Sequence, residues 1–458
     1  MPAGCALLAA MELIIPRWVA PVVPDGVILS DHAVALEHGR IVALAPAVQA
    51  REAWPQATVT ELPGHLLVPG FVNLHTHAPM SLLRGAGDDM PLQAWLRERI
   101  WPLEAKLMGP EFVADGTVLA CAEMLMGGIT CFNDMYFHPE AVAEAALDMG
   151  MRAAVGIIVV EFPSSYGSGP ADYIRKGLEM RDRLRDEPRL SFTLSPHAPY
   201  TVSDDSLRRV SSLAAELGLP VQCHVHETAG EITDSLAEHR RRPLQRLADL
   251  GLLGPEFIAI HAVHLDEADI ALLARHGASV AHCPHSNLKL ASGIAPTTRL
   301  MTAGVNLGVG TDGAASNNRL DLLSEARTAA LLAKGSSGDA TVWSAHQTLH
   351  AMTLGGARAL GLGARIGSIE PGKQADLTAV DLADPLSQPV FDPVAHLIHA
   401  AGREQVTHVW IDGQLVVRAR QLHAERAQLR LAEMRGRARL WHNRVVDTLP
   451  AGVRHPGG

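Results

Sequence analysis

Residues 66–77, which read LLVPGFVNLHTH, decide the fold of this chain. Their apolar run is typical of a strand buried on both faces, and the run ends in two histidines. Side chains two residues apart in a strand point the same way, so the imidazoles of His75 and His77 are expected side by side. Neutral imidazole is a favoured ligand of Zn²⁺ and Fe²⁺. One His-x-His pair is weak evidence in a chain with 23 histidines, so further ligands are needed.

Two more candidate ligands follow apolar, strand-like runs elsewhere in the chain. His224 comes directly after PVQC, and Asp312 comes directly after VNLGVGT. Together with His75 and His77, they place three histidines and one carboxylate at strand ends. Imidazole and carboxylate ligands suit a divalent transition metal, so the sequence predicts one mononuclear metal site made of these four residues.

Short strand-like runs alternate with helical stretches from residue 71 onward. Eight runs are present, at 71–74, 129–135, 153–160, 190–195, 221–224, 257–260, 279–282 and 305–310. Helix-like segments separate them, for example at 110–126 and 203–217. This alternation predicts a parallel (β/α)₈ barrel, a TIM-like α/β fold. An open doubly wound sheet would need a glycine-rich phosphate turn after an early strand, and the sequence has none there.

The two flanks of the predicted barrel have a different pattern. Residues 34–44 and 406–417 resemble hairpins, with turns at His38-Gly39-Arg40 and Asp412-Gly413. Neither flank can bury much apolar surface alone, so both are expected to form one small β-sandwich together. The predicted organisation is a disordered extension at 1–12, a composite sandwich at 13–68 plus 365–420, a catalytic barrel at 69–364, and a C-terminal helix and tail at 421–458.

Composition narrows the class of protein. Of 458 residues, 47% are hydrophobic and 19% charged, which suits a globular protein with a large core. The net charge of -10 argues against non-specific binding to nucleic acid or to an anionic membrane surface. No apolar run reaches the roughly 18 to 20 residues of a membrane span. Five cysteines without a Cys-x-x-Cys pair indicate free thiols in a reducing compartment, so a cytoplasmic protein is expected.

Other predicted strand ends also carry ionisable side chains. The fourth run leads to His197, the fifth continues past its predicted ligand to Glu227, and the sixth leads to His261 and His264. Catalytic groups of such barrels come from the C-terminal ends of different strands, which makes these residues candidates. Spacing alone does not choose between His261 and His264, and a core histidine is the alternative interpretation of His197.

The chain resembles the amidohydrolase superfamily, and within it the 5'-methylthioadenosine/S-adenosylhomocysteine deaminase family, over roughly residues 13–417. The most specific stretches are PGFVNLHTH at 69–77, SNLKLASG at 286–293 and GTDGAASNN at 310–318. The resemblance implies the barrel fold and the four metal ligands named above. It also implies one divalent ion per subunit, because His197 stands where binuclear relatives carry a bridging carbamylated lysine. The donor set suits zinc, iron and manganese alike, and zinc is predicted first.

The resemblance implies roles for several other residues. Glu227 matches the acid/base carboxylate, His261 a histidine that contacts the metal-bound water, and His197 a substrate-binding histidine. Glu104 matches a carboxylate that binds the ribose hydroxyls, although a carboxylate in a helical stretch is solvated by default. Trp95 is a candidate for the pocket wall, with a buried core aromatic as the alternative.

The chemistry of these groups fits hydrolytic deamination. A divalent metal makes water available as a nucleophile at neutral pH. Asp312 can accept the proton of that water, and Glu227 can protonate a ring nitrogen of the base. His261 can stabilise developing charge. The implied reaction is attack at adenine C6 with release of ammonia and an inosine-type product.

Members of this family differ in the group that they accept at the 5' position of the nucleoside. Binding of S-adenosylhomocysteine requires a partner for its carboxylate, usually an arginine fork. Here residues 154–162, AVGIIVVEF, are apolar and then acidic. Arg175 lies farther on and could reach the 5' group, but it does not match the expected register well. The predicted first substrate is therefore 5'-methylthioadenosine, converted to 5'-methylthioinosine, with adenosine and 5'-deoxyadenosine next and S-adenosylhomocysteine weaker.

Two other functions remain open from the sequence. Another enzyme of the superfamily would act on guanine, a cytosine-type base or a chlorinated triazine. A catalytically dead scaffold barrel would typically have lost metal ligands, whereas this chain keeps the full set. The partner predicted is a small-molecule nucleoside, and a homo-oligomer, first of all a dimer, is the expectation for the class.

Overall fold

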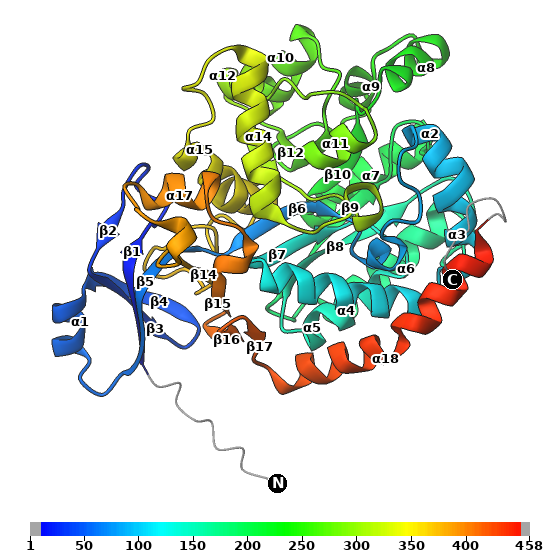
Figure 1. Cartoon of the computed structure of the whole chain (residues 1–458). Coiled ribbons are helices and arrows are strands. Elements are labelled where there is room, and N and C mark those ends of the chain that lie inside the picture. Colours follow the sequence, from blue (N-terminus) through cyan, green and yellow to red (C-terminus); the bar gives the residue numbers. More distant parts are fainter. Residues whose placement is uncertain (1–10, 450–458) are drawn as a thin grey trace.

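The computed structural model describes residues 11–449, which contain a parallel barrel and a separate mixed sheet (Figure 1). The barrel strands lie in chain order and are β6 (Phe71–Thr76), β7 (Ile129–Asp134), β8 (Arg152–Val159), β9 (Leu190–Pro196), β10 (Val221–Val225), β11 (Phe257–His261), β12 (Ser279–His282) and β13 (Asn306–Val309). Beyond β13, the Asp312 amide donates to the His75 carbonyl at 3.0 Å, and the Thr311 amide donates to the Asn73 side chain at 2.9 Å. These bonds bring the last strand against the first. The predicted barrel is confirmed, and its strand bounds agree within two residues.

Helices surround the barrel, so most of its strands are buried on both faces, as a parallel sheet requires. Those on the outside are α4 (Pro110–Met126), α5 (Pro139–Asp148), α6 (Pro170–Leu184), α7 (Asp204–Leu217), α8 (Ala229–His239), α9 (Pro243–Asp249), α10 (Glu267–His276), α12 (Thr297–Thr302), α14 (Leu322–Ser337), α15 (Ala345–His350) and α16 (Gly356–Ala359). Shorter elements near the carboxyl ends of the strands are α2 (Leu92–Trp95), a π-helical turn (Leu96–Ile100), α3 (Trp101–Leu107), α11 (Pro284–Lys289) and α13 (Ala314–Asn317).

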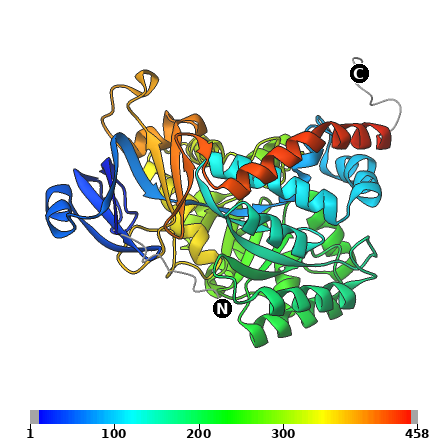
Figure 2. The same cartoon turned by 90° about the horizontal axis from the view of Figure 1, so that it is seen from below.

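The mixed sheet is built from both ends of the chain (Figure 2). Its strands are β1 (Glu12–Val19), β2 (Leu29–Ser30), β3 (His32–Glu37), β4 (Arg40–Pro46), β5 (Thr58–Pro69), β14 (Leu377–Asp381), β15 (Val406–Ile411), β16 (Gln414–Arg418) and β17 (Gln421–Leu422). Antiparallel pairing of β14 with β5 joins the two ends. The predicted hairpin turns are confirmed, because His38, Gly39, Asp412 and Gly413 all have positive φ angles between β3 and β4 and between β15 and β16. The domain bounds drawn from the sequence stay a prediction.

The barrel and the mixed sheet meet at a buried ion pair. Arg152, the first residue of β8, donates two hydrogen bonds to the Asp376 carboxylate, at 2.8 and 3.0 Å. Both side chains are at most 2% exposed. A third guanidinium nitrogen donates to the Pro188 carbonyl, and the Asp412 amide donates to the same carboxylate at 2.8 Å. Every charge of this pair therefore has a partner inside the protein.

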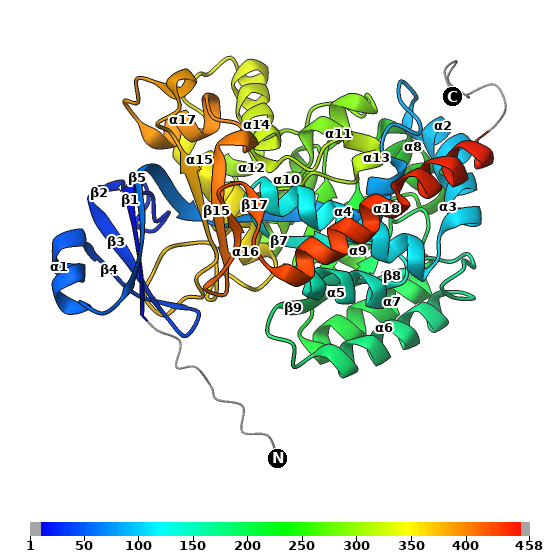
Figure 3. The same cartoon turned by 60° about the horizontal axis from the view of Figure 1, so that its bottom comes forward.

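The last helix, α18 (Glu425–Thr448), runs along the outside of the barrel across α4 (Figure 3). Its Trp441 ring stands edge-on to Phe112 and donates its indole N–H to Asp115 at 2.7 Å. No helix within residues 11–449 is both long and apolar enough to cross a membrane. The predicted extension at 1–12 lies outside the described residues except for its last two positions, the second of which begins β1. Helix α1 (Ala47–Ala53) packs on the mixed sheet, whereas α17 (Pro393–His399) packs on α14 and α15.

Candidate active site

The four predicted metal ligands converge at the carboxyl ends of β6, β10 and β13. The Nε2 atoms of His75 and His224 lie 3.2 Å apart. Asp312 Oδ1 lies 3.4 Å from His75 Nε2 and 3.3 Å from His77 Nε2. A regular tetrahedron with Zn–N bonds of about 2.0–2.1 Å has edges of about 3.3–3.4 Å. These three spacings fit ligands of one ion, so the residues present suit a divalent metal.

Hydrogen bonds on the far side of the rings orient two of the candidate histidine ligands. His77 Nδ1 lies 2.6 Å from the Met135 carbonyl, and His224 Nδ1 lies 2.7 Å from the His197 carbonyl. A ring nitrogen that donates to a carbonyl leaves the other with its lone pair free for a metal. Burial lowers the pKa of His75 to about 4 and that of His224 well below its ordinary value. Both rings are therefore neutral at pH 7, the form that binds a cation.

Asp312 is held by hydroxyl and amide donors. Its Oδ2 accepts from Ser286 Oγ at 2.6 Å and from Ser316 Oγ at 2.9 Å, while its Oδ1 accepts from the Gly313 amide at 2.8 Å. These donors favour the ionised form of the Asp312 carboxyl. The two serines were missed from the sequence. Ser316 had a usable signal, because it follows the ligand by four residues at a short helix.

Glu227 and His261 lie beside the ligand cluster. His261 Nε2 is 3.9 Å from Glu227 Oε2 and 4.0 Å from Asp312 Oδ2. His261 Nδ1 lies 2.8 Å from Asn287 Oδ1, which fixes the ring with Nε2 toward the cluster. His264 bonds a backbone carbonyl instead, so the structure distinguishes the two histidines that spacing left open. Burial raises the pKa of the Glu227 carboxyl above its ordinary value.

His197 lies next to the cluster and lines the same pocket. Its ring centroid is 4.9 Å from that of His224, and its Nδ1 lies 3.0 Å from Thr201 Oγ1. Burial lowers the pKa of His197 to about 3, so its ring is neutral at pH 7. Its carbonyl orients His224, a contribution that sequence reasoning did not include.

The cluster opens into a pocket that reaches the protein surface. Aromatic and aliphatic side chains make most of its wall: Met80, Leu92, Trp95, Leu96, Ile100, Trp101, Met135, Tyr136, Phe137, Ile158, Val160, Phe162, Tyr200 and Leu290. Trp95 is 5% exposed, and its indole N–H has no hydrogen-bond partner among the described residues. Sequence reasoning named Trp95 but missed Trp101 and Tyr136.

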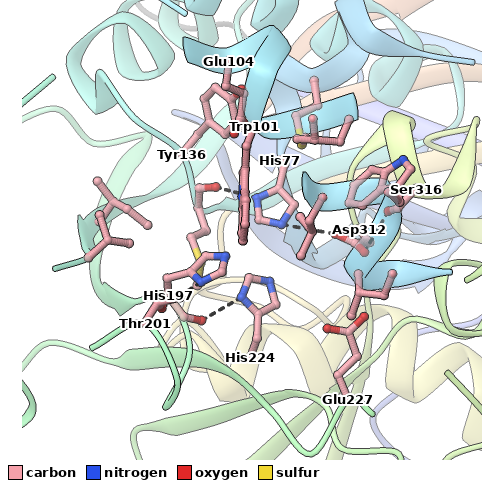
Figure 4. Close-up of a pocket in the computed structure, with 18 of the residues that line it drawn as sticks. His77, Trp101, Glu104, Tyr136, His197, Thr201, His224, Glu227, Asp312 and Ser316 are labelled. Carbon is pink, nitrogen blue, oxygen red and sulfur yellow. Dashed lines mark hydrogen bonds and ion pairs between the residues drawn. The ribbon is translucent and has the colours of Figure 1, made fainter. Parts of the chain in front are cut away.

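Glu104 and Glu227 lie at opposite sides of the cavity, with His77, His197 and His224 between them (Figure 4). Tyr136 Oη donates to Glu104 Oε1 at 2.7 Å, which leaves Oε2 for another donor. Burial raises the pKa of Glu104 to about 7, although the Tyr136 hydrogen bond opposes the shift. The structure therefore makes Glu104 a half-buried residue of the pocket wall rather than the solvated carboxylate that its helical position favours by default.

The apolar stretch after the third barrel strand also reaches the cavity. Ile158, Val160 and Phe162 line it, and Phe162 is 43% exposed at that wall. Arg175 is instead paired with Asp172 and Glu179 on α6. No lysine or arginine lines the cavity in the part of the chain that the structure describes.

Comparison with known proteins gives the family of this site. A sequence model of the amidohydrolase family matches residues 66–416. The chain belongs to the amidohydrolase family. Within that family, it is 46% identical to the 5-methylthioadenosine/S-adenosylhomocysteine deaminase of Saccharophagus degradans, over 89% of this chain and 91% of the relative. It is 47% identical to the enzyme of the same name from Teredinibacter turnerae, over 88% and 92%.

A solved structure supports the same placement within the amidohydrolase family. The adenosine deaminase of Xanthomonas campestris, determined with bound zinc, is 50% identical to this chain. The two structures superpose with a TM-score of 0.92 over 95% of this chain and 98% of that one. The family resemblance inferred from the sequence motifs is confirmed by these matches.

Proposed function

We propose that this chain is a metal-dependent hydrolase that deaminates adenine nucleosides, with 5'-methylthioadenosine as its first substrate. The observation that carries the proposal is that His75, His77, His224 and Asp312 converge beside a pocket that Glu104 and Glu227 also line. The names of the two relatives and of the Xanthomonas campestris structure support this class of reaction.

His75, His77, His224 and Asp312 would hold the ion. Zinc is the first candidate, because the Xanthomonas campestris structure contains zinc and the ligand spacings match those of a tetrahedral zinc site. The bound ion supplies an activated water at neutral pH. Iron and manganese suit the same donors, so reconstitution of metal-free protein with each ion in turn would test this assignment.

Glu227 and Asp312 would carry the proton transfers, and His261 would stabilise charge. As water attacks C6, one proton passes to the Asp312 carboxylate, and the protonated Glu227 carboxyl gives its proton to ring nitrogen N1. His261 Nε2 stabilises the charge that develops on the attacking oxygen. When the bond from C6 to the amine breaks, Asp312 delivers its proton to the amine, and Glu227 recovers one from the C6 hydroxyl. Ammonia leaves, and the product carries a C6 carbonyl.

Glu104 orients the ribose in this proposal. With C6 at the ligand cluster, the sugar lies farther out, where Glu104 Oε2 is free to accept from a ribose hydroxyl. Tyr136 holds the other carboxylate oxygen, so the free oxygen has a fixed direction. Trp95, whose N–H has no partner within residues 11–449, and the neutral His197 are the further substrate-binding side chains proposed at this wall.

The wall around the 5' group favours a thioether over a zwitterion. Ile158, Val160 and Phe162 offer apolar contact, and a buried amino-acid carboxylate would lack a cationic partner in the described cavity wall. We therefore place 5'-methylthioadenosine ahead of adenosine, 5'-deoxyadenosine and S-adenosylhomocysteine. A homodimer and a cytoplasmic location stay predictions from the sequence.

Ammonia release and loss of adenine absorbance by zinc-loaded protein would test the proposal. The panel should compare kcat/KM for 5'-methylthioadenosine, adenosine and S-adenosylhomocysteine, with guanine, cytosine and a chlorinated triazine as competing classes. We expect 5'-methylthioadenosine to lead. If S-adenosylhomocysteine led, the proposed 5' preference would be wrong while the site would stand. Turnover of only guanine, cytosine or triazine would contradict the nucleoside assignment, and no turnover of any compound would favour a dead scaffold.

A further inference from the structure

Glu227 sits on a tight turn whose backbone is unusual. The residue before it, His226, has a φ of +58°, in the left-handed region that non-glycine residues seldom adopt. Such a conformation costs free energy and persists only where surrounding contacts enforce it. The contacts that enforce this turn therefore also decide where the Glu227 carboxyl lies.

A second carboxylate, Glu231, supplies two of these contacts. Glu231 Oε1 accepts from the His226 amide and Oε2 from the Glu227 amide, both at 2.9 Å. Its side chain is 8% exposed and stands in the first turn of α8, the helix capped by Thr228. Each carboxylate oxygen thus holds one of the two consecutive amides of the turn.

The side chain of His226 anchors the turn from the other direction. Its Nδ1 lies 3.0 Å from the His264 carbonyl, and its Nε2 accepts from the Leu244 amide at 3.1 Å. Its own carbonyl accepts from the Val263 and His264 amides. The backbone between β10 and α8 is therefore fixed at the residue before Glu227, while Glu231 fixes Glu227 itself.

We propose that Glu231 is a positioning residue that holds Glu227 in place for proton transfer. Glu231 does not line the cavity of the metal cluster, so it acts through the Glu227 amide rather than on the substrate. The inference rests on the acid/base role proposed for Glu227. Misplacing a reacting group by about 1 Å can cost about 100-fold in rate, which sets the expected scale.

The test is Glu231→Gln, which keeps the shape of the side chain but presents an NH₂ group to one of the two amides. We expect kcat for 5'-methylthioadenosine to fall about 10- to 100-fold, with KM changed less than about 3-fold, because the defect lies in proton transfer. Metal content should remain that of the wild type. Glu238→Gln is the matched control, since Glu238 is exposed on the same helix and should leave kcat unchanged.

A double variant separates positioning from a general structural role. If Glu231 acts only through Glu227, then Glu227→Gln/Glu231→Gln should be as slow as Glu227→Gln alone, within about 2-fold. Multiplied losses, loss of metal, or wild-type kcat in Glu231→Gln would each overturn the proposal. If Glu231→Gln does not fold, Glu231→Asp replaces it under the same criteria, because its shorter carboxylate cannot reach both amides. Wild-type protein that deaminates no nucleoside would instead reject the proposed function.

Discussion

Two buried groups of charged and titratable side chains in this molecule differ in whether their charges and acceptor atoms are paired within the protein. Arg152 and Asp376, between the barrel and the mixed sheet, neutralise each other, and the Pro188 carbonyl and the Asp412 amide each add one hydrogen bond to the pair. At the ligand cluster, by contrast, the acceptor atoms of neutral His75 and His224 and of the Asp312 carboxylate converge at 3.2–3.4 Å.

The difference shows how a structural charge pair can be told from a functional site. Burying charge costs several kcal/mol per ion unless partners compensate it, and the Arg152–Asp376 pair has its partners. At the cluster, the proposed metal ion would face these converging acceptor atoms. We therefore expect changes at the pair to alter stability, and changes at the cluster to alter metal binding and activity.

The largest effect is expected from removing a ligand. His75→Ala should lower kcat/KM for 5'-methylthioadenosine by at least about 10⁴-fold, because the activated water depends on the ion. Bound metal, measured by mass spectrometry, should fall well below one ion per chain, while circular dichroism stays native. His239→Ala, at the surface end of α8, is the control. Full activity with a normal metal content would remove His75 from the predicted ligand set.

A change at the ion pair should instead lower the stability of the protein and leave its activity almost unchanged. Arg152→Met leaves the Asp376 carboxylate buried without its partner and should lower the free energy of unfolding by about 3–5 kcal/mol. The kcat of the folded protein at 25 °C should stay within about 2-fold of wild type. Urea denaturation and steady-state kinetics would measure both. A large fall in kcat with unchanged stability would contradict the distinction between the Arg152–Asp376 pair and the cluster of candidate ligands.

A change at Glu104, in the pocket wall, should affect substrate binding. Glu104→Gln should lower kcat/KM about 10- to 100-fold, mainly through KM, because an ionised acceptor for the ribose is lost. Since burial raises the pKa of Glu104 to about 7, its carboxyl gains a proton as the pH falls through 7. KM of the wild type should therefore rise from pH 8 to pH 6, and KM of the variant should not. Glu98→Gln, exposed on the adjoining turn, is the control.

The smallest effect is expected at the outer wall. Phe162→Ala removes part of the apolar surface near the 5' group and should lower kcat/KM for 5'-methylthioadenosine about 3- to 10-fold. Adenosine, which lacks the methylthio group, should be affected less than about 2-fold. Phe391→Ala, 90% exposed elsewhere, should change neither value. An equal loss for both nucleosides would place Phe162 away from the 5' group.

Much of the architecture could be predicted because its signals are local. A strand buried on both faces must be apolar along its length, so the eight runs and the barrel they imply could be identified directly. Positive φ angles at two-residue hairpin turns favour glycine, which located the turns at Gly39 and Gly413. Strand alternation and family resemblance together pointed to the ligands that the structure brings together.

Other features depend on residues far apart in the chain. Tyr136 meets Glu104, and Ser286 meets Asp312, only when loops from different strands pack together at the barrel mouth. The choice of His261 over His264 depends on a backbone turn that spacing does not reveal.

The sequence by itself therefore determined the barrel, the strand ends and the candidate ligands, because periodicity and residue type act within a few positions. Only the tertiary structure decided which groups orient those candidate ligands. It also decided that Arg152 and Asp376, which are 224 residues apart, form a buried ion pair. Such contacts depend on strand register and loop packing across the whole barrel, and the hydrophobic pattern leaves those undetermined.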